Sequence, residues 1–211
     1  MKHLVKLFRL LEITRSQQQY GYSLAEIQKS DISDLAQHHY LVAFFAWQIA
    51  RDVVKAGAKL NIEKVLAVAL IHDLGELFGG DIGMPYARAN PKARELAKKF
   101  EYENLRYFIK NFAKDDQDLQ ALAQEVFSPR SDEARIAKIA DYAEVTHYRL
   151  YNHRLTKGDV LMAKEKMMSY INEITDKKAM KVLKKFVDDW SRALLRGKFQ
   201  ELFEQSKLKK T

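Results

Sequence analysis

The chain contains no cysteine among its 211 residues. This absence excludes disulfide scaffolds and thiolate metal sites, so a metal here would be held by histidine nitrogens and carboxylate oxygens. Glycine and proline are also scarce, with eight and three residues, which favours helices over turn-rich β architectures. No apolar run approaches the roughly 20 residues that span a bilayer, because the longest are residues 41–47 and 65–71. We therefore expect a cytoplasmic protein without a membrane partner.

Helical periodicity dominates what the sequence does contain. Hydrophobic residues make up 47% of the chain and charged residues 30%, proportions typical of soluble globular proteins. Apolar residues recur at helical spacing almost everywhere, and we find no alternating strand pattern of useful length. The sequence predicts an all-α bundle with helices at about 2–15, 33–56, 61–75, 91–112, 115–127, 131–153, 156–173 and 176–204.

Polar residues and glycine mark the expected ends of these helices. The residues concerned are Asp31 or Ser33 as the cap of the second helix, Gly57 as its end, and Asn61 and Ser131 as caps of the third and sixth helices. Two segments, residues 17–23 and 78–86, contain glycine among polar or aromatic residues and do not fit a helical pattern. We expect both to be loops that line a site.

Two histidines and two aspartates, His38, His72, Asp73 and Asp141, lie within strongly apolar helical segments. Buried carboxylates are costly unless a cation compensates them. Two nitrogens and two oxygens with open positions suit one divalent transition metal (Mn, Co, Fe, Ni or Zn), which lowers the pKa of water and thereby implies hydrolysis. Glu76 follows His72 by four residues, which would place its carboxylate on the same helical face, ready to orient that water or take its proton.

The order of these residues, H…HD…D, resembles the signature of the HD-domain metal-dependent phosphohydrolases. Residues 35–43, 71–82 and 138–142 look like the 5'-deoxynucleotidase branch of that superfamily, including its HD-x-x-E-x-x-x-x-D pattern. The resemblance implies a single all-α HD domain with the metal site between helices. Its core would lie at about residues 20–155, followed by packing or interface helices at about 156–204 and a basic tail at 205–211.

The resemblance also implies roles for individual residues. The metal ligands would be His38, His72, Asp73 and Asp141. Glu76 would position or activate the attacking water, and Asp81 would meet the sugar hydroxyl or assist catalysis. The branch usually has Glu immediately before its first ligand histidine, where this chain has Gln37.

The residues that would contact substrate are less well defined by the pattern. The branch favours an Arg-x-Gly-Trp element, whose counterpart here is the segment 19–22, Gln-Tyr-Gly-Tyr. Arg15 and Arg88 are both candidates for holding phosphate. Tyr20 or Tyr22 would stack near the base or sugar.

Plainer interpretations exist for single residues. A histidine on an apolar helix is more often a hydrogen-bonded core residue than a ligand, and His39 competes with His38 for the position of first ligand. The spacing from His38 to residues 42–43 matches the family better. Asp141 taken alone would be a buried carboxylate paired with lysine or arginine.

The residues predict metal-assisted hydrolysis, and the resemblance implies an enzyme that releases phosphate from deoxyribonucleoside 5'-monophosphates and, as in relatives of this branch, a homodimer. The alternatives are another nucleotide phosphohydrolase, such as a dNTP triphosphohydrolase or a cyclic-nucleotide phosphodiesterase, or a non-catalytic metal- or nucleotide-binding protein. The formal net charge of +8 suits a phosphate-bearing substrate. Much of the excess lies in dispersed lysines and in residues 207–210, so nucleic acid is not the expected partner.

Overall fold

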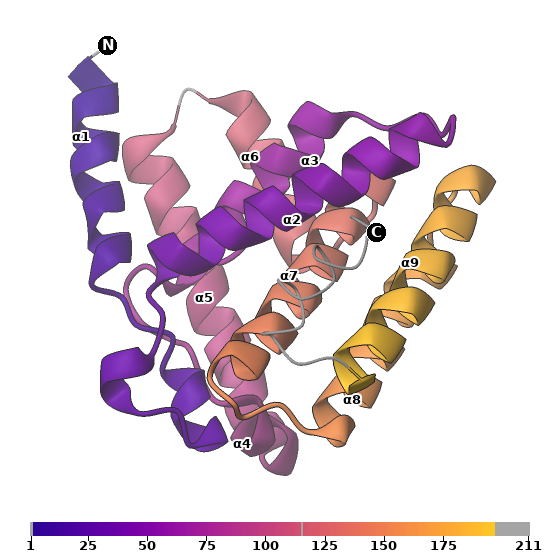
Figure 1. Ribbon diagram of the computed structural model, residues 1–211. Helices are drawn as coiled ribbons and strands as arrows, with labels where there is room; N and C mark the ends of the chain where they lie inside the picture. The colour runs from indigo at the N-terminus through magenta and orange to yellow at the C-terminus, as the bar shows by residue number, and fades with distance from the viewer. Residues whose placement is uncertain (1, 115, 197–211) are drawn as a thin grey trace, which may run out of the picture.

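A computed structural model describes residues 2–114 and 116–196 of the protein (Figure 1). Over these ranges the regular elements are helices, beside one isolated bridge between Gln18 and Asp34. The α-helices are α1 (Lys2–Leu11), α2 (Leu35–Lys55), α3 (Ile62–Ile71), α4 (Met84–Ala89), α5 (Pro91–Phe112), α6 (Gln117–Phe127), α7 (Asp132–Tyr151), α8 (Lys157–Asn172) and α9 (Lys177–Arg196). Four 3-10 helices join them: η1 (Glu12–Arg15), η2 (Tyr20–Ala25), η3 (Lys29–Asp31) and η4 (Leu74–Glu76). The predicted all-α fold is confirmed.

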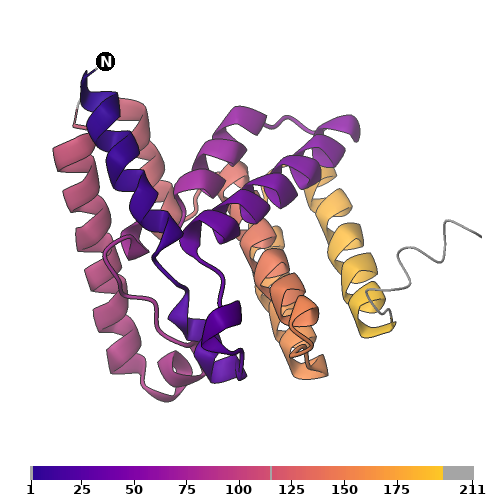
Figure 2. The ribbon, with the colours of Figure 1, turned by 60° about the vertical axis from the view of Figure 1, so that its left-hand side comes forward.

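The helices form two packed groups. In one, α2 packs against α3, α7 and α9, while α8 packs against both α7 and α9. In the other, α5 contacts α1, α4, α6 and η4, and α6 reaches back to α3. Figures 1 and 2 show α1, α5 and α6 on one side of the molecule and α8 and α9 on the other. A buried apolar cluster fills each group, and α3 contributes to both clusters.

Several helix ends lie where the sequence predicts them. The side chains of Asn61 and Ser131 each accept a hydrogen bond from the backbone N–H three residues further on, and so cap α3 and α7. Gly57 follows the end of α2 with a φ of +83°, in the left-handed region that glycine adopts without strain. None of the helices in the described part of the chain has the length and hydropathy of a membrane span.

The predicted cap of α2 needs a correction. Asp34, and not Asp31 or Ser33, accepts a hydrogen bond from the backbone N–H of Gln37, and the Gln37 side chain accepts one from the backbone of Asp34. This reciprocal capping box requires a residue three positions before Gln37. Asp31 lies earlier, in η3, and the Ser33 hydroxyl bonds instead to the side chain of Gln19.

The predicted third helix is too long. α3 ends at Ile71, and Asp73 leaves the helical region with φ −117° and ψ 19°. The chain then tightens into η4, in which the N–H of Glu76 donates to the carbonyl of Asp73 at 2.9 Å. Glu76 is therefore not one α-helical turn beyond His72, and that expectation is wrong. The break lets Gly75 approach α5 so closely that a Cβ at this position would lie 2.6 Å from a backbone carbonyl oxygen.

The two predicted loops also contain short helices. Residues 78–86 include the start of α4, which carries Pro85 in its first turn, where the missing N–H costs nothing. Residues 17–23 run into η2. The expected first helix is α1 followed by the tighter η1. Residues 197–204 of the last predicted helix and the predicted basic tail lie outside the described residues.

Candidate metal centre

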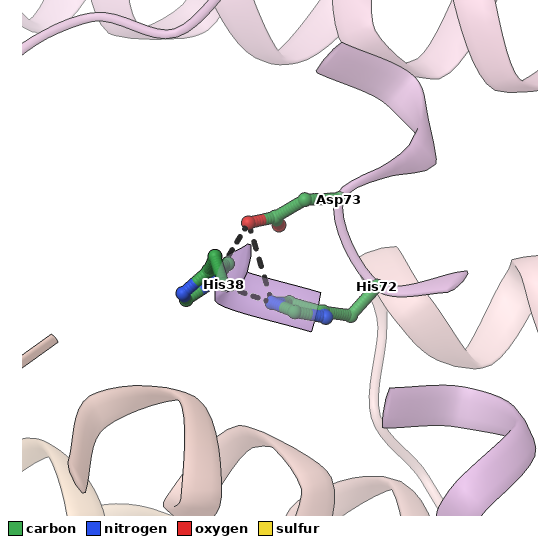
Figure 3. A group of neighbouring side chains, drawn as sticks. All are labelled: His38, His72 and Asp73. Atoms are coloured by element: carbon green, nitrogen blue, oxygen red, sulfur yellow. Dashed lines mark hydrogen bonds and ion pairs between the residues drawn. The ribbon is translucent and has the colours of Figure 1, made fainter. Parts of the chain in front are cut away.

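Three segments bring the four predicted ligands together. His38 lies in the first turn of α2, His72 and Asp73 follow the last residue of α3, and Asp141 is in the middle of α7. The Nε2 atoms of the histidines are 3.0 Å apart, and Asp73 Oδ2 lies 3.4 Å from that of His38 and 3.2 Å from that of His72 (Figure 3). Asp141 Oδ1 lies 3.6 and 3.8 Å from the same two atoms. All four side chains point at one position.

The second nitrogen of each imidazole is already engaged. His72 Nδ1 lies 2.8 Å from the carbonyl oxygen of Ala69, and His38 Nδ1 lies 2.6 Å from Glu144 Oε2. A carbonyl and a carboxylate only accept, so both Nδ1 atoms carry the proton and donate it. In its neutral form, each ring therefore presents an Nε2 lone pair to the other ring and to the two aspartates.

Such a convergence of lone pairs and negative charges requires a positive charge at its centre. His38, His72 and Asp73 offer one donor atom each within 4.8 Å of one another, and Asp141 adds an oxygen beside them. Divalent metals are usually bound by imidazole nitrogens and carboxylate oxygens, and hydrogen bonds from the second ring nitrogen hold the imidazoles in place. The residues present therefore fit a divalent ion.

The electrostatics of the cluster agree with this. Burial opposes the charged form of His38, but hydrogen bonds with Asp141, Asp73 and Glu144 outweigh it and raise the pKa of the imidazole well above its usual value. Burial would also raise the pKa of Asp141, yet the charge of Lys138 and the bond to His38 hold that pKa far below its usual range. The site thus favours positive charge, and a metal would compete there with protons.

A pocket of about 560 Å³ opens beside the cluster, lined by residues of η4, α4, α5, α7 and α8. Its wall combines apolar side chains with basic residues: Arg88, Arg94, Lys98, Lys138, Arg149 and Lys166. Two of these are already paired, since Lys138 Nζ lies 3.3 Å from Asp141 and Arg149 bonds Asp159 at 2.5 Å. A larger hollow of about 670 Å³ between α5 and α6 contains none of the predicted site residues.

The acidic residues predicted for catalysis line this pocket. Burial, together with the charges of Asp73, Asp81 and Glu101, raises the pKa of Glu76 well above its usual value. Asp81 Oδ2 accepts a hydrogen bond from the backbone N–H of Gly21 at 2.6 Å. A Cβ on Gly21 would lie 2.9 Å from the other oxygen of Asp81, so only glycine permits this contact between η2 and the site.

The predicted substrate contacts are placed differently from one another. Arg88 lines the pocket. Arg15 does not line it; this side chain is exposed, and its Nε lies 2.7 Å from Glu12 Oε2. Tyr20 is half exposed and does not line the pocket. Tyr22 is buried against Tyr148, with ring centroids 4.6 Å apart, and its hydroxyl has no hydrogen-bond partner among the described residues.

Sequence reasoning missed four features of the site. Glu144 and Lys138 flank Asp141 at three residues on α7, a spacing that places all three on one helical face and that was available from the sequence. Glu101 reaches the pocket from α5, and burial with the nearby Asp73 and Asp81 raises its pKa to about 7.

The fourth feature is helix α8. Residues of α8 line the pocket, although the sequence predicted only packing or an interface for this segment. His39, the alternative first ligand, is buried beside His72, with ring centroids 5.0 Å apart, and its Nε2 has no partner among the described residues. Burial and the proximity of His72 lower the pKa of His39 to about 3, so this ring is neutral.

The chain is similar to several known proteins. The HD domain family matches residues 15–204. The 5'-deoxynucleotidase PM0747 of Pasteurella multocida (strain Pm70) is 35% identical over 71 residues, which cover 32% of this chain and 35% of that protein. The match thus spans about a third of that relative's length.

Two solved structures share the fold. The PH0347 protein from Pyrococcus horikoshii OT3 aligns with a TM-score of 0.61 and 22% identity, covering 89% of this chain and 98% of that one. A conserved hypothetical protein from Pyrococcus furiosus aligns with a TM-score of 0.59 and 21% identity, covering 89% and 99%. At these identities the likeness concerns the fold alone. Because the family match extends over most of its length, the chain belongs to the HD-domain family.

Proposed function

We propose that the protein is a metal-dependent phosphohydrolase that releases phosphate from deoxyribonucleoside 5'-monophosphates. The observation that carries the proposal is the convergence of two Nε2 lone pairs and two carboxylates at the wall of a pocket rich in basic residues. The local match to a 5'-deoxynucleotidase supports the choice of substrate.

His38, His72, Asp73 and Asp141 would hold one divalent ion. When bound, such an ion polarises a phosphoryl oxygen and lowers the pKa of water. Mn, Co, Fe, Ni and Zn all suit this donor set. The protein fixes the donors beforehand, since both imidazoles are held by their Nδ1–H bonds and Asp141 by Lys138.

Basic residues of the pocket would hold the phosphate. Arg88, Arg94 and Lys98 line the pocket without an ion-pair partner among the described residues. Phosphate is attracted to such groups, and arginine can bind it through two parallel hydrogen bonds. These three residues are therefore proposed to neutralise the charge that the reaction concentrates on the phosphoryl oxygens.

Two carboxylates would handle the proton and the sugar. Glu76 lies in the pocket beside Asp73, and its raised pKa makes it a better base for water than an ordinary carboxylate. Asp81 is anchored through one oxygen to Gly21 and keeps the other for a sugar hydroxyl.

The test is phosphate release from a panel of deoxy- and ribonucleoside mono-, di- and triphosphates and a cyclic nucleotide, with Mn²⁺, Co²⁺ or EDTA. We expect metal-dependent release from deoxyribonucleoside monophosphates that is lost in Asp73→Ala. Arg88→Ala should raise KM, whereas Arg15→Ala, a matched control outside the pocket, should not. Cleavage of triphosphates or cyclic nucleotides instead would favour another nucleotide phosphohydrolase. Silence across the panel would overturn the proposed activity.

A homodimer is the expected assembly. The outer face of α2 carries exposed Tyr40, Leu41 and Phe44, and such apolar surface is typical of interaction sites. Analytical ultracentrifugation of the wild-type chain and of Phe44→Glu would test this prediction. A monomer at all concentrations would contradict it.

A further inference from the structure

The buried carboxylate of Glu144 is not one of the four proposed ligands and does not line the pocket. Glu144 is 3% exposed, and its one ion-pair partner among residues 2–114 and 116–196 is the imidazole of His38. Over the same ranges, no lysine or arginine lies within ion-pair distance of the Glu144 carboxylate. A buried carboxylate in such a place is unfavourable for stability compared with an apolar side chain of similar size. Stability alone therefore does not account for it.

The geometry points to a function that acts through His38. Glu144 Oε2 lies 2.6 Å from His38 Nδ1, a short distance typical of a charge-assisted hydrogen bond. The bond fixes the proton on Nδ1 and so leaves the Nε2 lone pair directed at Asp73 and His72. In the other tautomer, Nε2 would carry the proton and could not bind a metal.

The two histidines of the cluster differ in this respect. His72 donates to a neutral backbone carbonyl, that of Ala69, whereas His38 donates to a carboxylate. A negatively charged acceptor increases the electron density of the ring and makes its other nitrogen a stronger ligand. We infer that Glu144 is a positioning residue that selects the tautomer of His38 and makes it the tighter of the two histidine ligands.

Helix α7 supports this assignment by its spacing. Asp141 and Glu144 are three residues apart and therefore share one face of α7, the face that meets α2 at His38. One helix thus supplies both a ligand oxygen and the carboxylate that holds a second ligand. The inference rests on the proposed metal site but does not depend on the substrate.

The experiment compares the wild type with Glu144→Gln, which keeps the size of the side chain and removes its charge. Co²⁺ binding is measured by calorimetry and by the visible absorption of bound cobalt. We expect the dissociation constant to rise about 10- to 100-fold in Glu144→Gln, the usual effect of losing such a partner. Ser191→Ala, which removes another buried polar group, should leave it unchanged.

Unfolding of the metal-free proteins in urea separates this role from a structural one. A positioning role predicts that the cobalt affinity of folded Glu144→Gln falls and its cobalt spectrum changes, whether or not the metal-free variant is also less stable. An unchanged cobalt affinity with reduced stability would overturn the inference. Should the variant not fold, ¹⁵N NMR of the His38 ring in the zinc-loaded wild type decides, because a ring without a proton on Nδ1 would overturn the inference.

The outcome is distinguishable from failure of the proposed function. Cobalt binding that depends on Glu144, in a protein that releases no phosphate, would leave this inference standing and overturn the activity. A wild-type protein that binds no cobalt would overturn the inference itself.

Discussion

Gly75 allows η4 to lie against α5, and Gly75→Ala should disturb both the stability and the metal centre. A Cβ at this position would lie 2.6 Å from the backbone carbonyl oxygen of Glu101 and 3.2 Å from its Cβ. The Asn104 side chain fastens the same contact by donating to the carbonyl of Gly75 at 2.8 Å. Since the obstructing atom is backbone, η4 must move away from α5 to admit a methyl group.

Overpacking of this kind typically costs about 1–3 kcal/mol. We expect the free energy of unfolding of metal-free Gly75→Ala to fall by about this amount, as measured in urea. Because Asp73 precedes η4 and Glu76 ends it, the same displacement should weaken metal binding and lower the rate of hydrolysis.

Gly158→Ala is the matched control. Gly158 lies in the first turn of α8, and a Cβ there would meet its nearest atom, Thr156 Oγ1, at an ordinary 3.6 Å. Its unfolding free energy should stay equal or rise by about 0.4–1 kcal/mol, because alanine loses less backbone freedom than glycine on folding. Equal stability and equal metal affinity in Gly75→Ala and the wild type would refute the argument from close packing.

Substitutions at three further residues test other parts of the account. Glu125 accepts hydrogen bonds from Lys64 and from the backbone of Ser131, and these outweigh burial and lower the pKa of Glu125 to about 2. The charged carboxylate therefore stabilises the folded protein above about pH 4.5, and this contribution is lost as pH falls through about 2. Glu125→Gln should therefore lose about 1–3 kcal/mol at neutral pH in urea unfolding and match the wild type in strong acid. Glu101 has a pKa of about 7 and gains negative charge as pH rises through neutrality. The KM for a phosphate monoester should therefore increase over that pH range in the wild type and change less in Glu101→Gln. Ile139→Ala, which empties a fully buried position on α7, should lower the unfolding free energy by about 2–5 kcal/mol, against about 0.5–1.5 kcal/mol for Ile139→Val.

Most of the long helices and the caps of α3 and α7 were predictable because their causes are local. Asn61 and Ser131 cap their helices with their own side chains, and Gly57 ends α2 through its own backbone freedom. The early end of α3 has a distant cause, the contact of Gly75 with α5, which no spacing within the third helix reveals. The helical position expected for Glu76 failed for that reason.

The centre of the site was predictable from residue types, while its surroundings were not. Histidines and aspartates in apolar segments point to a cation because few other environments accommodate them. Glu101, Arg94 and the residues of α8 reach the pocket from elements that carry no motif. Arg15, chosen from the sequence as a phosphate contact, instead pairs with Glu12, its neighbour one turn before.

The central claim is that one divalent ion, held by His38, His72, Asp73 and Asp141, is required for phosphate ester hydrolysis. The most direct test is to remove metal from the protein, restore Mn²⁺ or Co²⁺ in steps, and measure bound metal and phosphate release on the same samples. The account predicts that activity rises in proportion to bound metal and saturates at one ion per chain. Full hydrolysis by the metal-free protein, or one bound ion that leaves it inactive toward every phosphate ester, would contradict it.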